Sequence, residues 1–136
     1  MFTYLFFCFA VIMLGCEIYE PPAKVITLNC DLDKDKHLEV IHVQKISGTY
    51  DDYGVFVTKS GNPPKMVLRI NDLDTQYDPY NVEIADMNGD TIQDIIVTRP
   101  VRGTYDDFEK VVAYGRGDLT FKEPERIAYL KDFGSN

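Results

Sequence analysis

From residue 25 onward, short apolar runs alternate with clusters of turn-forming residues. Alternation is clear in Val82-Glu83-Ile84 and Val55-Phe56-Val57, and no stretch beyond residue 15 has the spacing of an amphipathic helix. Such runs, separated by Gly, Pro, Asn and Asp, are typical of β-strands. The pattern predicts eight strands, at Val25–Asn29, Leu38–Lys45, Gly54–Lys59, Lys65–Ile70, Asn81–Ala85, Ile95–Arg99, Glu109–Tyr114 and Phe121–Tyr129.

The chain contains an internal duplication at an offset of 55 residues. Residues 31–57 and 86–112 are identical at nine of 27 positions, and both contain the pentapeptide Gly-Thr-Tyr-Asp-Asp, at 48–52 and 103–107. A period of this order is typical of stacked repeats. We therefore expect an all-β domain over residues 25–136, built from two tandem four-stranded antiparallel, blade-like repeats: 25–71 and 81–136, joined by a linker over 72–80.

Two four-stranded units can be arranged in three ways. Two blades are too few to close a propeller, which needs about four to eight. The units can pack together as a small sandwich with one core, lie side by side as an open propeller fragment, or form a ring with other copies of the chain. Exposed sheet edges promote aggregation. We therefore prefer compact packing of the two sheets, with a homo-oligomer as the second choice.

Each repeat opens with acidic side chains at every second position. Both loops follow the pattern D-x-[DN]-x-D-x-x-x-[DE], in which four side chains can converge on one point. Ca²⁺ takes about six to eight oxygen ligands and tolerates irregular geometry. The pattern therefore predicts two Ca²⁺ sites, with ligands Asp31, Asp33, Asp35 and Glu39 in the first loop, and Asp86, Asn88, Asp90 and Asp94 in the second.

Other metal sites fit these loops less well. An EF-hand requires Gly at loop position six and Glu at position twelve, but the first loop has Lys36 and His42 there, and the second has Thr91 and Val97. Both loops also lead into β-branched, strand-like residues instead of a helix. No His or Cys occupies a ligand position, which disfavours zinc and copper.

An acidic loop that leads directly into a strand, repeated at this period, resembles the FG-GAP or VCBS repeat of integrin-type β-propellers and bacterial surface proteins. The resemblance rests on the segments 31–35 and 85–90, the strand 94–97 and the glycine-rich turn 115–121. It implies a calcium-binding β-repeat. The glycine that the family favours at loop position six is Lys36 or Thr91 in this chain.

The acidic loops and the pentapeptides each have a simpler interpretation. Asp and Asn favour turns through local hydrogen bonds, so an acidic run can be a solvated turn. The pentapeptide can be a hairpin loop with Gly at positive φ, which we favour. Alternatively, its acids Asp51, Asp52, Asp106 and Asp107 can add extra Ca²⁺ ligands or support the ligands from outside the coordination shell.

The amino terminus resembles a bacterial lipoprotein signal. Residues 2–15 are uncharged and apolar, are too few to span a bilayer, and end at Leu14-Gly15-Cys16. We expect a signal peptide over 1–15, lipidation at Cys16 and a tether over 16–24. No Lys or Arg precedes the apolar run, although a basic segment is usual there, and the alternatives are a plain membrane anchor or a signal that is simply cleaved.

Charge and chemistry narrow the function. The formal net charge of −8 belongs to residues after Gly15, which disfavours nucleic acid as a partner because nucleic acid attracts Lys and Arg clusters. His37 and His42 have no neighbouring nucleophile motif, and the spacing of Asp35 and Glu39 suits metal ligation better than sugar hydrolysis. We expect no enzyme activity.

The sequence thus predicts a calcium-binding lipoprotein of the cell envelope, periplasmic or surface-exposed, held to the membrane by its lipid. It would act as a scaffold or binding module for an envelope protein or glycan. The alternative is a carbohydrate-binding or accessory subunit of an envelope enzyme or complex. The loop rings Tyr50, Tyr53, Tyr105 and Phe108 are the candidate contact surface; alternatively, they cap the core.

Overall fold

The computed structural model describes residues 26–71, 73, 80–104 and 106–131. These residues form eight strands joined by turns and loops, without a helix. The strands are β1 (Thr27–Cys30), β2 (Glu39–Lys45), β3 (Tyr53–Thr58), β4 (Lys65–Ile70), β5 (Asn81–Ala85), β6 (Asp94–Pro100), β7 (Phe108–Ala113) and β8 (Glu125–Leu130).

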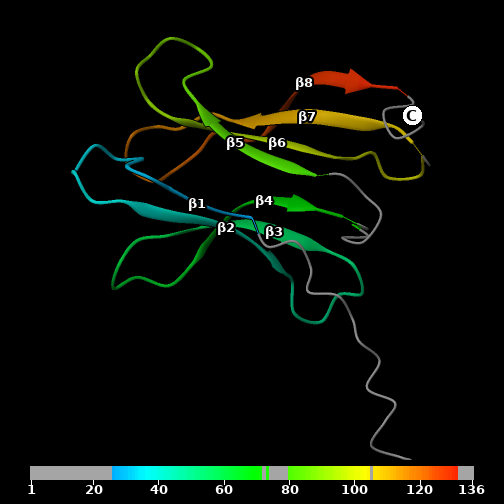
Figure 1. Cartoon of the computed structure of the whole chain (residues 1–136), viewed down its shortest axis with the longest axis horizontal. Coiled ribbons are helices and arrows are strands. Elements are labelled where there is room, and N and C mark those ends of the chain that lie inside the picture. The colour runs from blue at the N-terminus through cyan, green and yellow to red at the C-terminus, as the bar shows by residue number, and fades with distance from the viewer. Residues whose placement is uncertain (1–25, 72, 74–79, 105, 132–136) are drawn as a thin grey trace, which may run out of the picture.

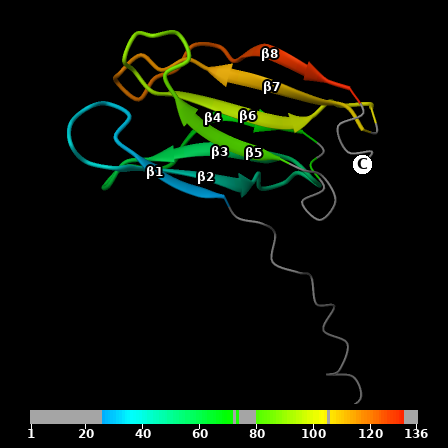
Figure 2. The ribbon, with the colours of Figure 1, turned by 45° about the horizontal axis from the view of Figure 1, so that its top comes forward.

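The strands form two separate antiparallel sheets, each in sequence order. The first sheet is β1-β2-β3-β4 and the second is β5-β6-β7-β8. They lie as two layers, the second above the first in Figure 1, and Figure 2 shows the same layers from a tilted direction. The predicted all-β class with two four-stranded antiparallel units is confirmed. The sheets do not close into a barrel.

The duplication extends to the hydrogen-bonding register. Cys30 pairs with Glu39 in the first sheet, and Ala85 pairs with Asp94 in the second. Both sheets also carry an irregularity at equivalent positions, between Val55 and Phe56 and between Lys110 and Val111. Since a register slip by one residue would move every side chain to the other face, the shared offset makes the two units true structural repeats.

One apolar core lies between the two sheets. From β2 and β3 it takes Ile41, Val43, Val55 and Val57, and from the second sheet Val82, Ile95, Val97 and Val111. Residues that alternate along a strand point to opposite faces. The shared core confirms the expected compact packing.

The two units contribute opposite faces to this core. The position equivalent to Ile41 is Ile96, which lies on the outer face of the second sheet. The positions equivalent to Val97 and Val111 are His42 and Phe56, which lie on the outer face of the first. The sheets therefore stack head to tail, as neighbouring repeats do in an array.

Both outer faces differ from their core-facing counterparts. On the second sheet, Thr98 and Lys110 replace the Val43 and Val55 of the first, and the ammonium of Lys110 lies 3.6 Å from a carboxylate oxygen of Glu83. On the first sheet, His42 stacks on Phe56 with ring centroids 5.7 Å apart. The outer face of the second sheet therefore carries an ion pair, and the outer face of the first carries an aromatic stack.

Two predicted strand starts were wrong by more than one residue. The last strand does not start at Phe121; it runs over Glu125–Leu130, and Phe121 forms only an isolated bridge with Gly115. Pro124 explains the break, because proline has no N–H to donate to a ladder. The first strand begins at Thr27 instead of Val25, which lies outside the described residues.

The segment predicted as a linker contributes to the core. Leu73 and Tyr80 are buried in it, and the backbone N–H of Leu73 donates to the carbonyl of Asp51 at 2.7 Å. Residues 72 and 74–79 lie outside the described part of the chain. Leu73 and Tyr80 therefore tie the connection to both sheets.

A group of charged side chains lies beside the core. Glu109 accepts hydrogen bonds from Arg99 Nε at 2.8 Å and from Arg126 Nε at 2.5 Å, and Arg99 also donates to the Arg69 carbonyl of the first sheet at 2.5 Å. Burial by itself raises the pKa of the Glu109 carboxyl. The hydrogen bonds and positive charges of the two arginines outweigh burial and hold this pKa below its ordinary value.

We expect Glu109→Gln to lower the free energy of unfolding by about 1–3 kcal/mol at neutral pH, because two charged donors lose their acceptor. Because the folded-state pKa is lowered, the contribution is present above the ordinary value of 4.5 and is lost as the pH falls through the folded pKa. Urea unfolding of both proteins from pH 7 to pH 3 checks this. A difference in stability that does not shrink with acid would contradict it.

Candidate metal centre

The two acidic loops lie at the same end of the molecule. The first loop (residues 31–39) leads from β1 to β2, and the second loop (residues 86–94) leads from β5 to β6 (Figure 1). The loops touch, because the ammonium of Lys34 donates to the hydroxyl of Thr91 at 2.8 Å.

Both loops fold around their first aspartate by the same hydrogen bonds. In the first loop, the backbone N–H groups of Asp35 and Lys36 donate to the Asp31 carboxylate at 3.1 and 2.9 Å. In the second, those of Asp90 and Thr91 donate to Asp86 at 3.2 and 2.8 Å. The N–H of Thr91, followed by the N–H groups of Gly89, Asp90 and Asn88, holds the pKa of Asp86 below its usual range against the opposing effect of desolvation.

The tight coil requires left-handed backbone at loop positions four and six. These positions are Lys34 and Lys36 in the first loop, with φ of 62° and 71°, and Gly89 and Thr91 in the second, with φ of 77° and 69°. A non-glycine residue pays about 1–2 kcal/mol for this conformation. Three of the four positions are not glycine and carry this conformational cost. The hydrogen bonds from the loop backbone to Asp31 and Asp86 must therefore outweigh it.

The acid at position nine is the first residue of a strand and is fully buried. Glu39 and Asp94 both have 0% exposed surface. Each accepts a hydrogen bond at 2.8 Å from the backbone N–H of loop position two, Leu32 or Met87. This carboxylate therefore fastens each loop to its sheet.

The second oxygen of this acid differs between the loops. Oδ1 of Asp94 accepts the backbone N–H of Gly115 at 2.8 Å. Oε1 of Glu39 is buried and has no hydrogen-bond partner among the described residues. A buried carboxylate oxygen without a hydrogen-bond partner lowers the stability of the fold. In the first loop, a bound cation or a further hydrogen-bond donor would compensate this oxygen.

Three predicted ligands of the first loop come together. One carboxylate oxygen from each of Asp31, Asp33 and Glu39 lies within 4.8 Å of the other two. The fourth predicted ligand, Asp35, forms an ion pair with Lys59 and accepts a hydrogen bond from the backbone N–H of His37 at 2.8 Å. In the second loop, Asp86, Asp90 and Asp94 form no such group of three within the described chain, and Asn88 Nδ2 donates to Asp90 at 3.0 Å.

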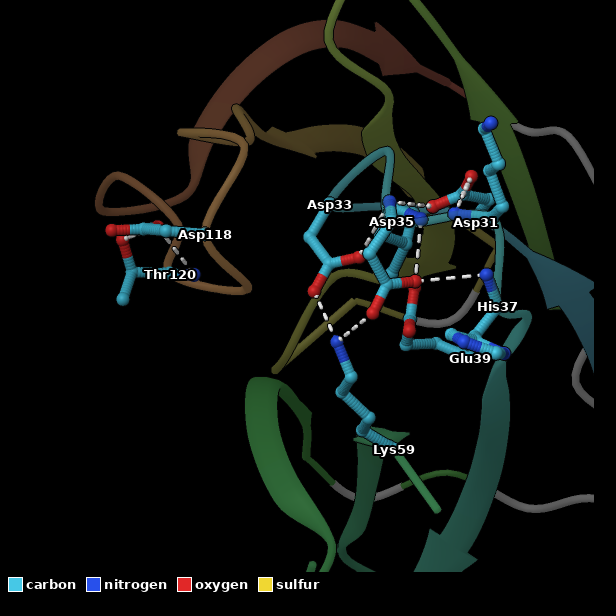
Figure 3. A network of polar contacts seen from close by, with 10 residues as sticks. Asp31, Asp33, Asp35, His37, Glu39, Lys59, Asp118 and Thr120 are labelled. Carbon is cyan, nitrogen blue, oxygen red and sulfur yellow. Dashed lines mark hydrogen bonds and ion pairs between the residues drawn. The ribbon is translucent and has the colours of Figure 1, made fainter.

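A lysine from outside the loop contacts the first site. Lys59, which follows β3, lies with its Nζ 2.5 Å from carboxylate oxygens of both Asp33 and Asp35 (Figure 3). The hydrogen bonds that Lys59 donates to Asp33 and then to Asp35 raise the pKa of Lys59, and the bond to Asp35 is the main cause that lowers the pKa of Asp35. Sequence reasoning missed Lys59, because only the fold brings β3 to this loop.

The difference between the loops arises from the hairpins beside them. The connection between β3 and β4 covers residues 59–64, whereas that between β7 and β8 covers 114–124. The longer connection carries Gly115 over the second loop. A Cβ atom at Gly115 would lie 2.4 Å from the carbonyl oxygen of Gln93, so only glycine permits this approach.

The pentapeptide loops are hairpin loops at the other end of the sheets, because they connect β2 to β3 and β6 to β7. Gly48 and Gly103 have φ of 81° and 82°, which confirms the favoured interpretation. The alternative, extra Ca²⁺ ligands from these loops, stays a prediction; in the structure Asp52 pairs with Arg69, and Asp107 accepts the Tyr129 hydroxyl at 2.6 Å. A seven-residue strand separates them from the acidic loops by about 20 Å.

The rings of the pentapeptide loops do not form one surface. Tyr50 is 90% exposed, Phe108 is 2% exposed, and Tyr53 packs against the core. Tyr105 lies outside the described residues, as does the predicted lipidation site Cys16. In the described part of the chain, no helix has the length and apolarity needed to cross a bilayer.

Comparison with protein-family models, curated proteins and solved structures finds no match for this chain.

We expect Gly115→Ala to lower the free energy of unfolding by about 1–3 kcal/mol, because the added methyl group overlaps the Gln93 carbonyl and displaces the N–H from Asp94. Ser60→Ala is the matched control, since Ser60 is the equivalent position of the first unit and is exposed; it should change stability by less than about 0.5 kcal/mol. Equal effects of the two variants in urea unfolding would contradict this asymmetry.

Proposed function

We propose that the protein is a calcium-binding, non-enzymatic exported lipoprotein that acts as a cell-envelope scaffold or binding module through FG-GAP/VCBS-like repeats. The observation that carries the proposal is the convergence of Asp31, Asp33 and Glu39 around a buried, unpartnered Glu39 oxygen. Hard oxygen donors without His or Cys suit Ca²⁺ better than zinc or copper.

In the first loop, Asp31, Asp33 and Glu39 would hold the ion, and Asp35 would join them. A bound Ca²⁺ would cancel the repulsion between these carboxylates and supply the missing partner of Glu39. In the second loop, Asp86, Asn88, Asp90 and Asp94 would form a weaker site, because both oxygens of Asp94 already accept backbone hydrogen bonds.

The mechanism is structural. A bound ion would fix the loop between β1 and β2 relative to the second loop. Lys34 of the first loop already contacts Thr91 of the second. Extracellular calcium modules have dissociation constants of about 10⁻⁴–10⁻³ M. At millimolar Ca²⁺, one such site adds about 0.4–1.4 kcal/mol to the free energy of unfolding. That is a useful fraction of the stability of a small domain.

Residues 1–16 support the location. The apolar stretch that ends at Cys16 would direct export and lipidation, and residues 17–24 would tether the domain to the membrane. All of the acidic residues follow this stretch, so the net charge of −8 would be displayed in a compartment where Ca²⁺ is available to neutralise part of it. Its partner there would be an envelope protein or glycan.

A second candidate is a carbohydrate-binding or accessory subunit of an envelope enzyme or complex. It is favoured by the outer face of the first sheet, where His42 stacks on Phe56 and Met66 is 49% exposed. Aromatic faces of this kind can contact sugars. Binding to an immobilised polysaccharide panel that is lost in Phe56→Ala, with an unchanged response to Ca²⁺, would favour this candidate over a scaffold.

Thermal unfolding with Ca²⁺ tests the principal proposal. Raising Ca²⁺ from chelator to several millimolar should increase the melting temperature of the full chain by about 2–8 °C, and Mg²⁺ should not. Glu39→Gln should abolish the increase without lowering stability in chelator, because the amide oxygen can still accept the Leu32 N–H while the substitution removes a buried charge with one unpaired oxygen.

Asp118→Asn is the matched control. It removes an acid from the turn between β7 and β8, apart from the first loop in Figure 3, and should keep the response. A flat melting temperature for the unmodified protein would mean that the loops are solvated turns. A Ca²⁺ response that survives in Glu39→Gln would mean that the ion binds elsewhere.

A further inference from the structure

We propose that the ammonium of Lys59 is a resident cation of the first loop, which a divalent ion must displace, so that Lys59 sets the calcium affinity of this site. The inference rests on the proposed calcium binding, and it adds the identity of the group that competes with the metal.

Contacts with Asp33 carry the argument. One oxygen of its carboxylate lies 2.5 Å from Lys59 Nζ, and the same side chain belongs to the group of three acids with Asp31 and Glu39. Lys59 also holds Asp35, the fourth acid of the loop, at 2.5 Å. The ammonium therefore forms ion pairs with two of the four carboxylates that a metal ion would use.

Charge prevents the ammonium and the metal from sharing the site. A divalent ion bound to Asp33 would lie within a few ångströms of Lys59 Nζ, and like charges at that separation repel strongly even at the effective dielectric constant of a protein surface. Carboxylate oxygens that donate electron pairs to a metal are also less available to accept from an ammonium. Binding of the ion thus requires Lys59 to leave.

Lys59 can leave without a change of fold. It follows the end of β3, its side chain is 29% exposed, and lysine has a flexible four-carbon stem. It also lines a cleft of about 120 Å³ with Asn62, Pro63, Lys65 and Leu119. Displacement breaks two ion pairs and leaves the strand unchanged.

Among the described residues, no lysine or arginine forms an ion pair with an acid of the second loop. The position equivalent to Lys59 is Tyr114, and the Asp90 carboxylate accepts hydrogen bonds from the Asn88 amide and the Ile92 N–H. The competition is therefore particular to the loop that gathers three carboxylates.

Isothermal titration of the full chain with CaCl₂ tests the inference, using Lys59→Met and the control Lys34→Met. Both variants remove one positive charge from the neighbourhood of the first loop, but Lys34 bonds the Thr91 hydroxyl and no carboxylate of the group. Lys59→Met should tighten Ca²⁺ binding about tenfold, since two partly exposed ion pairs no longer oppose it. Lys34→Met should tighten it less than about threefold.

The outcomes separate the two proposals. Equal affinities for Lys59→Met and Lys34→Met, with clear binding by the unmodified chain, would overturn the role of Lys59 and leave calcium binding intact. Binding by Lys59→Met alone would support the competition in its strongest form. No binding by any of the three proteins would overturn both proposals.

A measurement on the unmodified protein guards against misfolding of the variant. Acetylation of lysines with acetic anhydride, read by mass spectrometry, should be several-fold faster at Lys59 in Ca²⁺ than in chelator, because displacement frees its amine. Lys65, which forms no ion pair with these carboxylates within the described chain and lines the same cleft, is the internal reference. Equal reactivity of Lys59 in both conditions would overturn the inference.

Discussion

A buried carboxylate at the first residue of a strand holds each half of this structure together. Glu39 and Asp94 are excluded from solvent, and each accepts the backbone N–H of the second loop residue. Burial of a charge is tolerated only where hydrogen bonds or a counter-ion compensate it. The loop therefore cannot move away from its sheet without exposing an unsatisfied donor and a poorly solvated acid. Loop shape, strand start and register all depend on this contact.

The same contact explains how two copies of one sequence pattern have acquired different properties. Asp94 is fully satisfied, because a longer hairpin places Gly115 over it. Glu39 has a longer side chain and a shorter neighbouring hairpin, and one of its oxygens has no partner in the described chain. Both loops are thus held by backbone hydrogen bonds to their acids, and the first loop is held in addition by the ion pairs of Lys59 with Asp33 and Asp35. A divalent ion would therefore stabilise the first loop more than the second.

Much of this could be predicted from the sequence. Alternation in segments such as Val82-Glu83-Ile84 located the strands, and the 55-residue offset predicted two equivalent sheets. The ligand spacing located Asp31, Asp33 and Glu39. Three features depend on the third dimension and could not be predicted. These are the approach of Lys59, the closure of Gly115 on Asp94, and the use of opposite faces by the two sheets. The break before Glu125 could have been predicted from Pro124, because proline interrupts a ladder.

Locating the ion directly tests the central claim, that the first loop is a metal centre built from Asp31, Asp33 and Glu39. Crystals grown with Ca²⁺, or with Tb³⁺ in its place for a stronger anomalous signal, would reveal the site without reference to stability. The account predicts an anomalous peak among these three carboxylates, with the Lys59 side chain turned away from Asp33. A first loop without a peak, in which Lys59 still bridges Asp33 and Asp35 at millimolar Ca²⁺, would contradict it.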